Sequence, residues 1–161
     1  VDKKATLTYV QLMKEDLAVF RLVPEDGVIP DYDTGQFITL GMPIPSEDNK
    51  IIRRAYSIAS HPENKRFIEL VIRWVRKPLP GRVTTALFNA GEGNEVSWLP
   101  PTGAALQINE KLADGSKDQR RIVCVSGGTG IAPFMAFARH LHATGDHRQL
   151  ICLHGSSYVD E

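Results

Sequence analysis

The chain has 161 residues, of which 42% are hydrophobic, 24% charged and 7% aromatic. These proportions are ordinary for a soluble globular protein, and a chain of this length can bury a substantial core. Lysine plus arginine total 19 and aspartate plus glutamate total 19, so the formal net charge is zero. The composition therefore provides no overall attraction to nucleic acid or to an anionic membrane, and neither is expected as a partner. No apolar run approaches the roughly 18 residues of a membrane-spanning helix.

The N-terminal segment and the cysteines bear on where the protein works. Residues 1–5 lack the apolar stretch of a secretory signal. Cys124 and Cys152 each lie inside a short apolar run, which favours two buried thiols in strands. Their spacing fits neither a zinc nor an iron–sulfur pattern, so no metal site is expected. Free thiols indicate a reducing compartment, and we expect a cytoplasmic protein.

Six short stretches in the first two thirds of the chain predict β-strands. The clearest is 67–76, where apolar residues at every second position predict one firmly apolar face and one mixed face. Trp74 in this stretch and Trp98 are expected in the core. A short helix over 83–89 interrupts the strands, and Gly/Pro punctuation favours a small antiparallel barrel or sandwich. The other five predicted strands are 7–12, 17–23, 35–41, 53–59 and 94–99, the last closed by Pro100 and Pro101.

The pattern changes after a polar, turn-rich stretch at 114–119, which is a candidate linker. Residues 121–126 form an apolar run without alternation, as in a buried parallel strand, and 150–154 form a second one. The helical pattern of 131–144 lies between them, with Pro133 in its first turn and Gly145 at its end. This is one βαβ unit, whose sheet keeps an uncovered edge and face. Since the last residues resemble the start of another helix, we expect the protein to continue beyond Glu161 or a neighbouring surface to cover the gap.

A glycine-rich segment, Gly127-Gly-Thr-Gly-Ile-Ala-Pro133, joins the first of these strands to the helix. Glycines let the backbone approach a ligand closely, and a helix N-terminus offers free N–H groups to an anion. The segment is therefore a candidate phosphate loop, although it is neither a G-x-G-x-x-G nor a Walker A sequence. A tight strand–helix turn without a ligand is the alternative, and spacing alone leaves both open.

Two further motifs lie in the β-rich part. Arg54-Ala-Tyr56-Ser57 falls on a predicted strand, where Arg54 and Tyr56 share a face and Ser57 points the other way. An arginine beside an aromatic can hold a phosphate while a ring stacks on the aromatic, but the pattern is also common in strands without a ligand. Gly81-Arg-Val-Thr84-Thr85 opens the short helix. A threonine there can cap the helix, or the helix start can hold a second phosphate.

The three motifs occur in a definite order: R-x-Y-S on a strand, G-x-x-T at a helix start, then G-G-T-G-I-A-P after the linker. This combination resembles the ferredoxin–NADP reductase superfamily over essentially the whole chain, including Gly35-Gln36-Phe37 before the third strand. Arg54–Ser60 is most similar to bacterial ferredoxin/flavodoxin reductases. The resemblance implies a mainly β fold, with an antiparallel β-barrel flavin-binding domain over 1–115 and the first βαβ unit of an α/β NAD(P)-binding domain over 121–161. It also implies C-terminal truncation, because family members continue further.

The resemblance assigns roles to the strand motif. Arg54 would meet the flavin phosphates, and Tyr56 would stack on the isoalloxazine ring. Ser57 would hydrogen-bond near flavin N5, the atom that accepts hydride, and Ala55 completes the motif. Ser57 and Thr129 are accordingly the expected catalytic residues, with Thr129 near the nicotinamide.

The resemblance also implies three further groups of cofactor-binding residues. A strand would line the flavin and supply a second cation from Arg73. The short helix would cradle the pyrophosphate, and the glycine-rich loop would hold the nicotinamide nucleotide. In chain order these residues are Val71, Ile72 and Arg73; Gly81, Val83, Thr84 and Thr85; and Gly128, Thr129, Gly130 and Pro133.

The function implied by the resemblance is that of a flavoprotein oxidoreductase. NADPH or NADH would give a hydride to FAD, which is favoured over FMN, and single electrons would pass to ferredoxin or flavodoxin. Ser157 stands where many bacterial flavodoxin reductases have an arginine that clamps the 2′-phosphate, so NADP is only modestly favoured over NAD. An acidic carrier would dock on basic side chains. The candidates are Arg53, Arg54, Lys77, Arg82 and Arg139.

Three other functions stay open at this point. The chain could be the reductase component of an oxygenase or of another electron-transfer system. An iron–sulfur centre would then lie elsewhere, because the chain has no cysteine cluster. It could also be a flavin-binding module without turnover, completed by a partner. A β-barrel binding protein without flavin is the last alternative, and it predicts a colourless sample.

Overall fold

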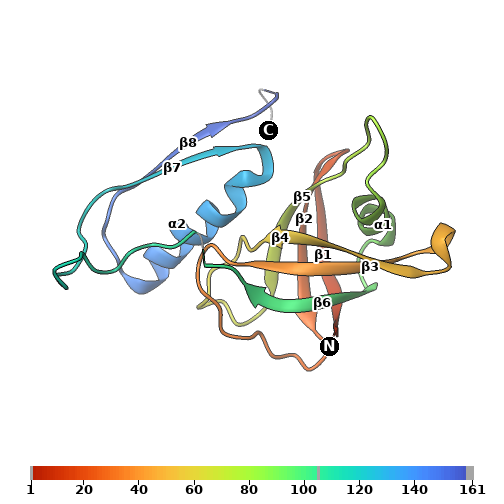
Figure 1. Ribbon diagram of the computed structural model, residues 1–161, viewed down its shortest axis with the longest axis horizontal. Helices are drawn as coiled ribbons and strands as arrows, with labels where there is room; N and C mark the ends of the chain where they lie inside the picture. The colour runs from red at the N-terminus through yellow and green to blue at the C-terminus, as the bar shows by residue number, and fades with distance from the viewer. Residues whose placement is uncertain (1, 105, 159–161) are drawn as a thin grey trace.

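The computed structural model describes residues 2–104 and 106–158. Six antiparallel strands form one sheet in the order β4-β3-β6-β1-β2-β5 (Figure 1). The edge strands β4 and β5 contact each other, so the sheet closes into a barrel, which confirms the predicted architecture. The strands are β1 (Lys3–Lys14), β2 (Leu17–Pro24), β3 (Phe37–Ile44), β4 (Lys50–Ser57), β5 (Ile68–Arg73) and β6 (Glu95–Thr102), with a 3₁₀ turn η1 (Pro45–Glu47) between β3 and β4.

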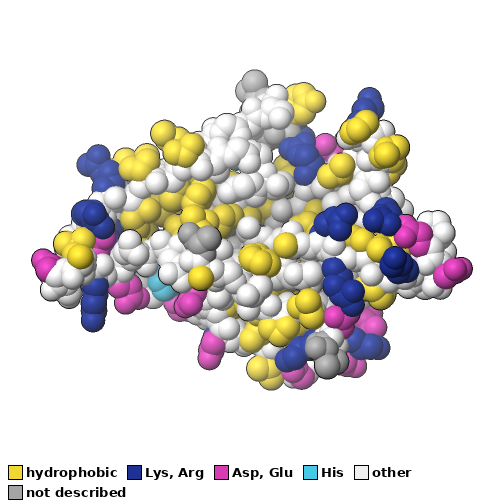
Figure 2. Space-filling model, in the orientation of Figure 1, with side chains coloured by type: hydrophobic (Ala, Val, Ile, Leu, Met, Phe, Trp, Pro, Cys, Tyr) yellow, Lys and Arg dark blue, Asp and Glu magenta, His cyan; other side chains and the backbone are white. Residues whose placement is uncertain are grey.

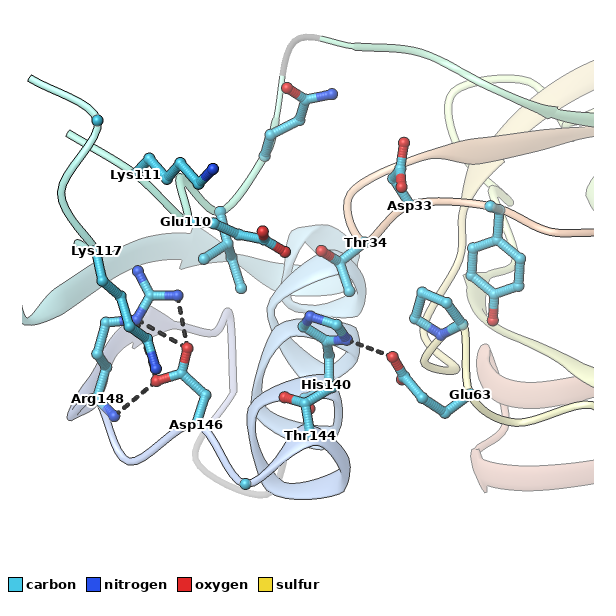
Figure 3. A pocket seen from close by; sticks show the side chains of 16 residues that line it. Asp33, Thr34, Glu63, Glu110, Lys111, Lys117, His140, Thr144, Asp146 and Arg148 are labelled. Atoms are coloured by element: carbon cyan, nitrogen blue, oxygen red, sulfur yellow. Dashed lines mark hydrogen bonds and ion pairs between the residues drawn. The ribbon is translucent and has the colours of Figure 1, made fainter. Parts of the chain in front are cut away.

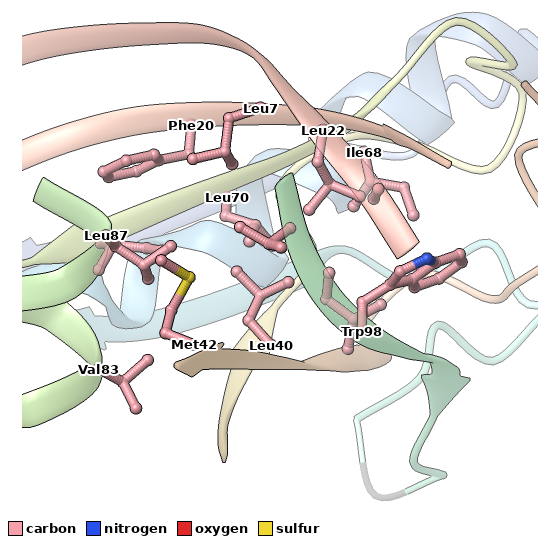
Figure 4. Packing of buried hydrophobic residues seen from close by; sticks show 14 of the residues in the cluster. Leu7, Phe20, Leu22, Leu40, Met42, Ile68, Leu70, Val83, Leu87 and Trp98 are labelled. Atoms are coloured by element: carbon pink, nitrogen blue, oxygen red, sulfur yellow. The ribbon is translucent and has the colours of Figure 1, made fainter. Parts of the chain in front are cut away.

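Alternation along the strands builds the barrel core. In β2 every second side chain is buried, and β5 buries Ile68, Leu70 and Ile72 on the same inner side. Helix α1 (Arg82–Ala90) covers one end of the barrel and inserts Val83 and Leu87 into the core (Figure 4). Burial of these apolar side chains, each worth about 1.5–3 kcal/mol, is the main source of stability. The fully buried large side chains are Trp98, Phe20, Leu7, Leu22, Ile38, Leu40, Ile58, Ile68, Leu70, Ile72, Leu87 and Val96.

The two tryptophans differ in their surroundings. Trp98 is fully buried, as expected, and its indole N–H donates to the Lys4 carbonyl at 3.2 Å. Trp74 lies just past the end of β5 and is only half-buried, so its placement in the core is wrong. Its ring packs on Phe88 of α1, with centroids 5.4 Å apart. Trp74 therefore joins the barrel to the helix instead of filling the core.

Strand β6 continues through the two prolines that were expected to end it. Its pairing with β1 stops at Trp98, opposite Lys3. Beyond that point β6 pairs only with β3, with a register shift before Thr102 pairs with Phe37. Proline is tolerated in such a stretch because one side of the strand no longer needs amide donors.

The second part of the structure is the predicted βαβ unit. Strands β7 (Ile122–Gly127) and β8 (Leu150–Gly155) pair in parallel, with Cys124 opposite Cys152. Between them come a 3₁₀ turn, η2 (Gly128–Ile131), and helix α2 (Ala132–Thr144). Gly145 ends α2 in the left-handed region, at φ 69°, which confirms the predicted stop.

The prediction that β7 and β8 are buried strands is wrong. Helix α2 packs on one face and buries Cys124, but the other face is open (Figure 2). Val123, Val125 and Leu153 are 58%, 72% and 58% exposed, and the thiol residue Cys152 is exposed rather than buried. The sheet of β7 and β8 thus has the uncovered face and edge that were predicted. The expected start of a further helix at 159–161 lies outside the described residues, and within them no helix is long and apolar enough to cross a membrane.

Candidate functional site

The strand motif lies on β4, where the register with β3 fixes its orientation. Tyr56 pairs with Ile38 and Arg54 with Leu40, so both lie on one face, as predicted. The Tyr56 ring packs against the barrel core, and Arg54 is exposed, with its Nη1 donating to the Arg53 carbonyl at 2.8 Å. Ala55 and Ser57 are exposed.

The Tyr56 hydroxyl is the one buried side-chain polar atom without a hydrogen-bond partner among the described residues. Burial raises the pKa of Tyr56 to about 12, against a smaller opposite effect of the Arg54 charge. Buried hydroxyls in proteins are nearly always paired, because an unpaired one costs about 1–3 kcal/mol. The unpaired hydroxyl therefore marks this part of β4 as a candidate binding site.

The start of α1 fits an anion. Gly81 is the N-cap, and a Cβ at this position would lie 2.6 Å from Thr84 Oγ1, so a larger residue does not fit. Thr84 Oγ1 donates to the Gly81 carbonyl at 3.1 Å, while Thr85 Oγ1 accepts from the Trp74 indole N–H at 2.9 Å. Both hydroxyls are thus used elsewhere, and neither caps the helix amides. The first N–H groups of α1 are available to a phosphate.

The three predicted residues of β5 face in two directions. The Ile72 side chain is buried in the barrel core, so only its backbone could reach a ligand outside. Val71 and Arg73 are half-buried on the outer face. Arg73 Nη1 donates to Asp16 Oδ2 at 2.9 Å, which makes the expected second cation one half of an ion pair. Likewise, Val83 of α1 is a core residue and can contribute only backbone groups.

The glycine-rich loop forms η2 and the start of α2, beside β5 and β8. Gly128 has φ 49°, which favours glycine, whereas a Cβ at Gly130 would meet nothing within 4 Å. Thr129 is half-buried, and Pro133 is buried in the first turn of α2. The structure thus brings the loop next to β5, the strand that the resemblance expects to line the flavin.

A polar contact across the two parts of the structure was not predicted. Glu69 of β5 is almost fully buried and accepts from Arg21 Nε at 2.8 Å and from Arg139 Nη1 of α2 at 2.6 Å. Burial alone would raise the pKa of Glu69, but hydrogen bonds from Arg139 and Arg21 outweigh it and lower the pKa. The available signal was weak: Glu69 is a charged residue on the mixed face of a strongly alternating strand.

A cavity of about 850 Å³ is lined by none of the predicted site residues. It opens between a barrel loop that contains Thr34, the stretch 107–117 and the C-terminal end of α2 (Figure 3). His140 Nδ1 and Glu63 Oε1 are 2.8 Å apart across it, and Arg148 pairs with Asp146. Side chains of both charges, Asp33, Glu110, Lys111 and Lys117 among them, also line it, so it is a mixed polar crevice without a distinct ligand chemistry.

Comparisons with known proteins agree with this geometry. The family described as "Oxidoreductase FAD-binding domain" matches residues 4–106, which include the whole barrel. The chain belongs to this family. Its fold is that of the ferredoxin–NADP reductase superfamily, a mainly β barrel followed by a βαβ unit.

Two curated relatives illustrate the range of full-length proteins. The flavohemoprotein of Bordetella pertussis is 28% identical over 141 residues, which cover 86% of this chain and 33% of that protein. The reductase component of propane 2-monooxygenase from Mycolicibacterium goodii is 27% identical over 168 residues, covering 99% of this chain and 44% of that protein. The chain therefore spans less than half the length of both relatives.

Solved structures show the same fold at low identity. The FAD/NAD-binding domain of nitric oxide dioxygenase from Vibrio cholerae has a TM-score of 0.83 at 22% identity, covering 99% of this chain and 64% of that one. A ferredoxin NADP⁺ reductase from Neisseria gonorrhoeae, solved with bound FAD and NADP, has a TM-score of 0.77 at 20% identity, covering 99% and 59%.

Proposed function

We propose that this chain binds FAD on the outer side of the barrel, along β4, β5 and the start of α1. The observation that carries the proposal is the buried, unpartnered hydroxyl of Tyr56, since it lies on the same strand face as the Arg54 guanidinium. The Tyr56 ring would stack on the flavin, and Arg54 together with the first amides of α1 would hold the phosphates. Ser57 would contact the reacting edge of the ring.

The glycine-rich loop would hold a nicotinamide dinucleotide. The first amides of a helical segment lack partners within it, and the open space at Gly130 would let a phosphate approach the backbone there. When bound, the flavin takes two electrons from the dinucleotide and releases them one at a time. The protein's part is to bind and orient the two rings, with Thr129 beside the nicotinamide. No general base is required.

NADPH is proposed ahead of NADH by a small margin. Ser157 follows β8, and the resemblance assigns this position to the 2′-phosphate of NADP, which a hydroxyl can bind. Near the ends of β7 and β8, Ser126 Oγ lies 2.8 Å from His154 Nδ1, and this contact holds the His154 imidazole in place. The dissociation constants of NADPH and NADH for this chain, measured side by side, decide the preference.

The electron acceptor is proposed to be ferredoxin or flavodoxin. Three of the five expected docking cations already have carboxylate partners: Arg53 pairs with Asp2, Arg82 with Glu47 and Arg139 with Glu69. Since Arg54 is assigned to the flavin phosphates, docking on this chain would depend mainly on Lys77 among the five.

A second candidate is the reductase component of an oxygenase. It is favoured by the likeness to the propane 2-monooxygenase reductase component, which extends over 99% of this chain. We also propose that the chain divides into a flavin-binding domain over 1–115 and a partial NAD(P)-binding domain over 121–161. The proposed location of the protein is the cytoplasm. The alternative, a flavin module without turnover, predicts that NADPH does not reduce the bound flavin.

An anaerobic absorption spectrum tests these proposals together. We expect purified protein, after incubation with FAD, to show the two visible flavin bands, and these bands should bleach when NADPH is added. Bands that persist with both NADPH and NADH would favour the module without turnover. A protein that takes up no FAD would overturn the proposed function. Reduction of ferredoxin by the bleached protein, compared with reduction of an oxygenase component, separates the two acceptor classes.

A further inference from the structure

One guanidinium connects the glycine-rich loop to two segments of the proposed flavin site. Arg139 lies on α2, the helix that begins directly after η2. Its Nη1 donates to Glu69 Oε1 on β5 at 2.6 Å and to the Ala59 carbonyl at 2.8 Å. Ala59 follows the strand motif by two residues, and Glu69 precedes Val71 by two residues on the same face of β5.

The receiving carboxylate is held rigidly by the barrel. Glu69 is 3% exposed at its side chain, and its second oxygen accepts from Arg21 Nε at 2.8 Å. The Arg21 guanidinium in turn lies over the rings of Tyr9 and Phe67, 4.6 and 4.2 Å from their centroids. Arg21 therefore belongs to the barrel, and Arg139 is the partner that comes from the other part of the chain. Removing Arg139 leaves a buried carboxylate with one cation instead of two.

A second contact runs parallel to the first. His140, the next residue of α2, places Nδ1 2.8 Å from Glu63 Oε1, and His61 Nδ1 lies 2.9 Å from the other oxygen of Glu63. Its carboxylate is more exposed than that of Glu69, 36% against 3%. It connects α2 to the barrel but reaches neither β4 nor β5, the strands that line the proposed flavin site.

We propose that Arg139 is a positioning residue that sets the place of the glycine-rich loop relative to the flavin-lining strands. The inference rests on the proposed function, in which the dinucleotide on the loop reacts with the flavin on β4 and β5. Arg139 would touch neither cofactor. It would act through Glu69 and the Ala59 carbonyl, because displacement of α2 carries the loop with it. A misplacement of about 1 Å between reacting groups can cost about 100-fold in rate.

The test compares four FAD-loaded proteins: wild type, Arg139→Gln, Arg139→Lys and the control Arg120→Gln. Arg120 also pairs with a carboxylate, but its partner Asp118 is only two residues away, so the pair does not join the two parts. Two quantities are measured: the limiting rate of flavin bleaching at saturating NADPH, and hydrogen exchange of the amides in 127–137 before NADPH is added. FAD content and the NADPH dissociation constant are recorded for each protein.

We expect Arg139→Gln to lower the limiting rate by about 10- to 100-fold, with FAD content and NADPH affinity within about twofold of wild type. Exchange in 127–137 should become at least about tenfold faster. Arg139→Lys should give a limiting rate and an exchange rate between those of wild type and Arg139→Gln, because its ammonium can still reach the carboxylate. Arg120→Gln should match wild type in both quantities. Unchanged rate and unchanged exchange in Arg139→Gln would overturn the proposal, as would a rate loss that only follows a loss of FAD.

The design also separates failure of the inference from failure of the proposed function. If wild type takes up no FAD or is not bleached, the proposed function fails. The exchange measurement on the flavin-free chain then decides whether Arg139 holds the loop, and equal exchange in wild type and Arg139→Gln overturns that role. Glu69→Gln removes the same contact from the barrel side and should reproduce the exchange change, which guards against a folding defect peculiar to one variant.

Discussion

Replacing Tyr56 with phenylalanine should change stability and flavin affinity in opposite directions. The substitution removes one hydroxyl and leaves a ring that packs against the core. In the flavin-free chain this hydroxyl is buried and has no partner among the described residues, a situation that costs about 1–3 kcal/mol. Tyr56→Phe should therefore raise the unfolding free energy of the flavin-free protein by up to that amount. For a chain of this size, each kcal/mol corresponds to a melting temperature about 2–4 °C higher.

In the flavin-loaded protein the same hydroxyl would hydrogen-bond to the cofactor. Because pairing the hydroxyl with FAD would recover the cost of about 1–3 kcal/mol, its removal corresponds to FAD binding that is about 5- to 160-fold weaker. Thermal unfolding of the flavin-free proteins and titration of FAD by fluorescence quenching measure the two effects. Because the pKa of Tyr56 is about 12, the hydroxyl stays protonated, and the affinity ratio should not vary between about pH 6 and about pH 9.

Tyr56→Ala is the matched comparison. It removes the ring as well, so it should lower both stability and FAD affinity, the latter by more than Tyr56→Phe does. The reasoning is refuted if Tyr56→Phe destabilises the flavin-free chain while FAD affinity is unchanged. That result would mean that the hydroxyl has a partner within the protein and that the flavin lies elsewhere.

Three further outcomes are expected. Gly130→Val should leave FAD affinity and melting temperature unchanged but weaken NADPH binding at least about tenfold, because a side chain there enters open space beside the loop. If calorimetry gives the same NADPH affinity for this variant and for wild type, the dinucleotide does not bind at this loop. Glu69→Gln should lower the unfolding free energy by about 1.5–3 kcal/mol at neutral pH. Since the Glu69 pKa is lowered from 4.5, this difference should persist above that value and shrink as pH falls through the folded-state pKa, as denaturant unfolding at a series of pH values will show. Leu40→Ala, at a fully buried position, should cost about 2–5 kcal/mol in the same assay with no change in the pH dependence.

The fold could be predicted to the level of its elements because local patterns determine them. Alternation in 67–76 and the run of 121–126 before glycines are signals within single segments, and both became strands, the second parallel to β8 as expected but not buried. Two errors have a common cause. Trp74 and Cys152 were placed in the core from the polarity of their neighbours, but burial depends on what lies across from a residue. Trp74 meets the side of α1, and Cys152 lies on an open edge strand.

Much of the candidate site could also be predicted, since each motif lies on one element. The shared face of Arg54 and Tyr56 and the glycine at the start of α1 follow from the sequence, and the structure has both. The roles of Thr84 and Thr85 could not be predicted. Either could have capped the helix, and only the structure shows that their hydroxyls bond to Gly81 and to Trp74.

The two sides of the site are held in place by different kinds of interaction, and this explains what the sequence could not reveal. On the side proposed to bind flavin, Tyr56 is fixed by a ladder of backbone hydrogen bonds, whose register is repeated at every residue of β3 and β4. On the side proposed to bind the dinucleotide, the loop is carried by α2. The contact that joins α2 to β5 is that of Arg139 with Glu69, two residues that are 70 positions apart in the sequence and belong to no motif. A repeated ladder tolerates a single substitution, whereas a single buried ion pair does not. Substitutions in the barrel should therefore change mainly stability, and substitutions at this contact should change mainly the position of the loop.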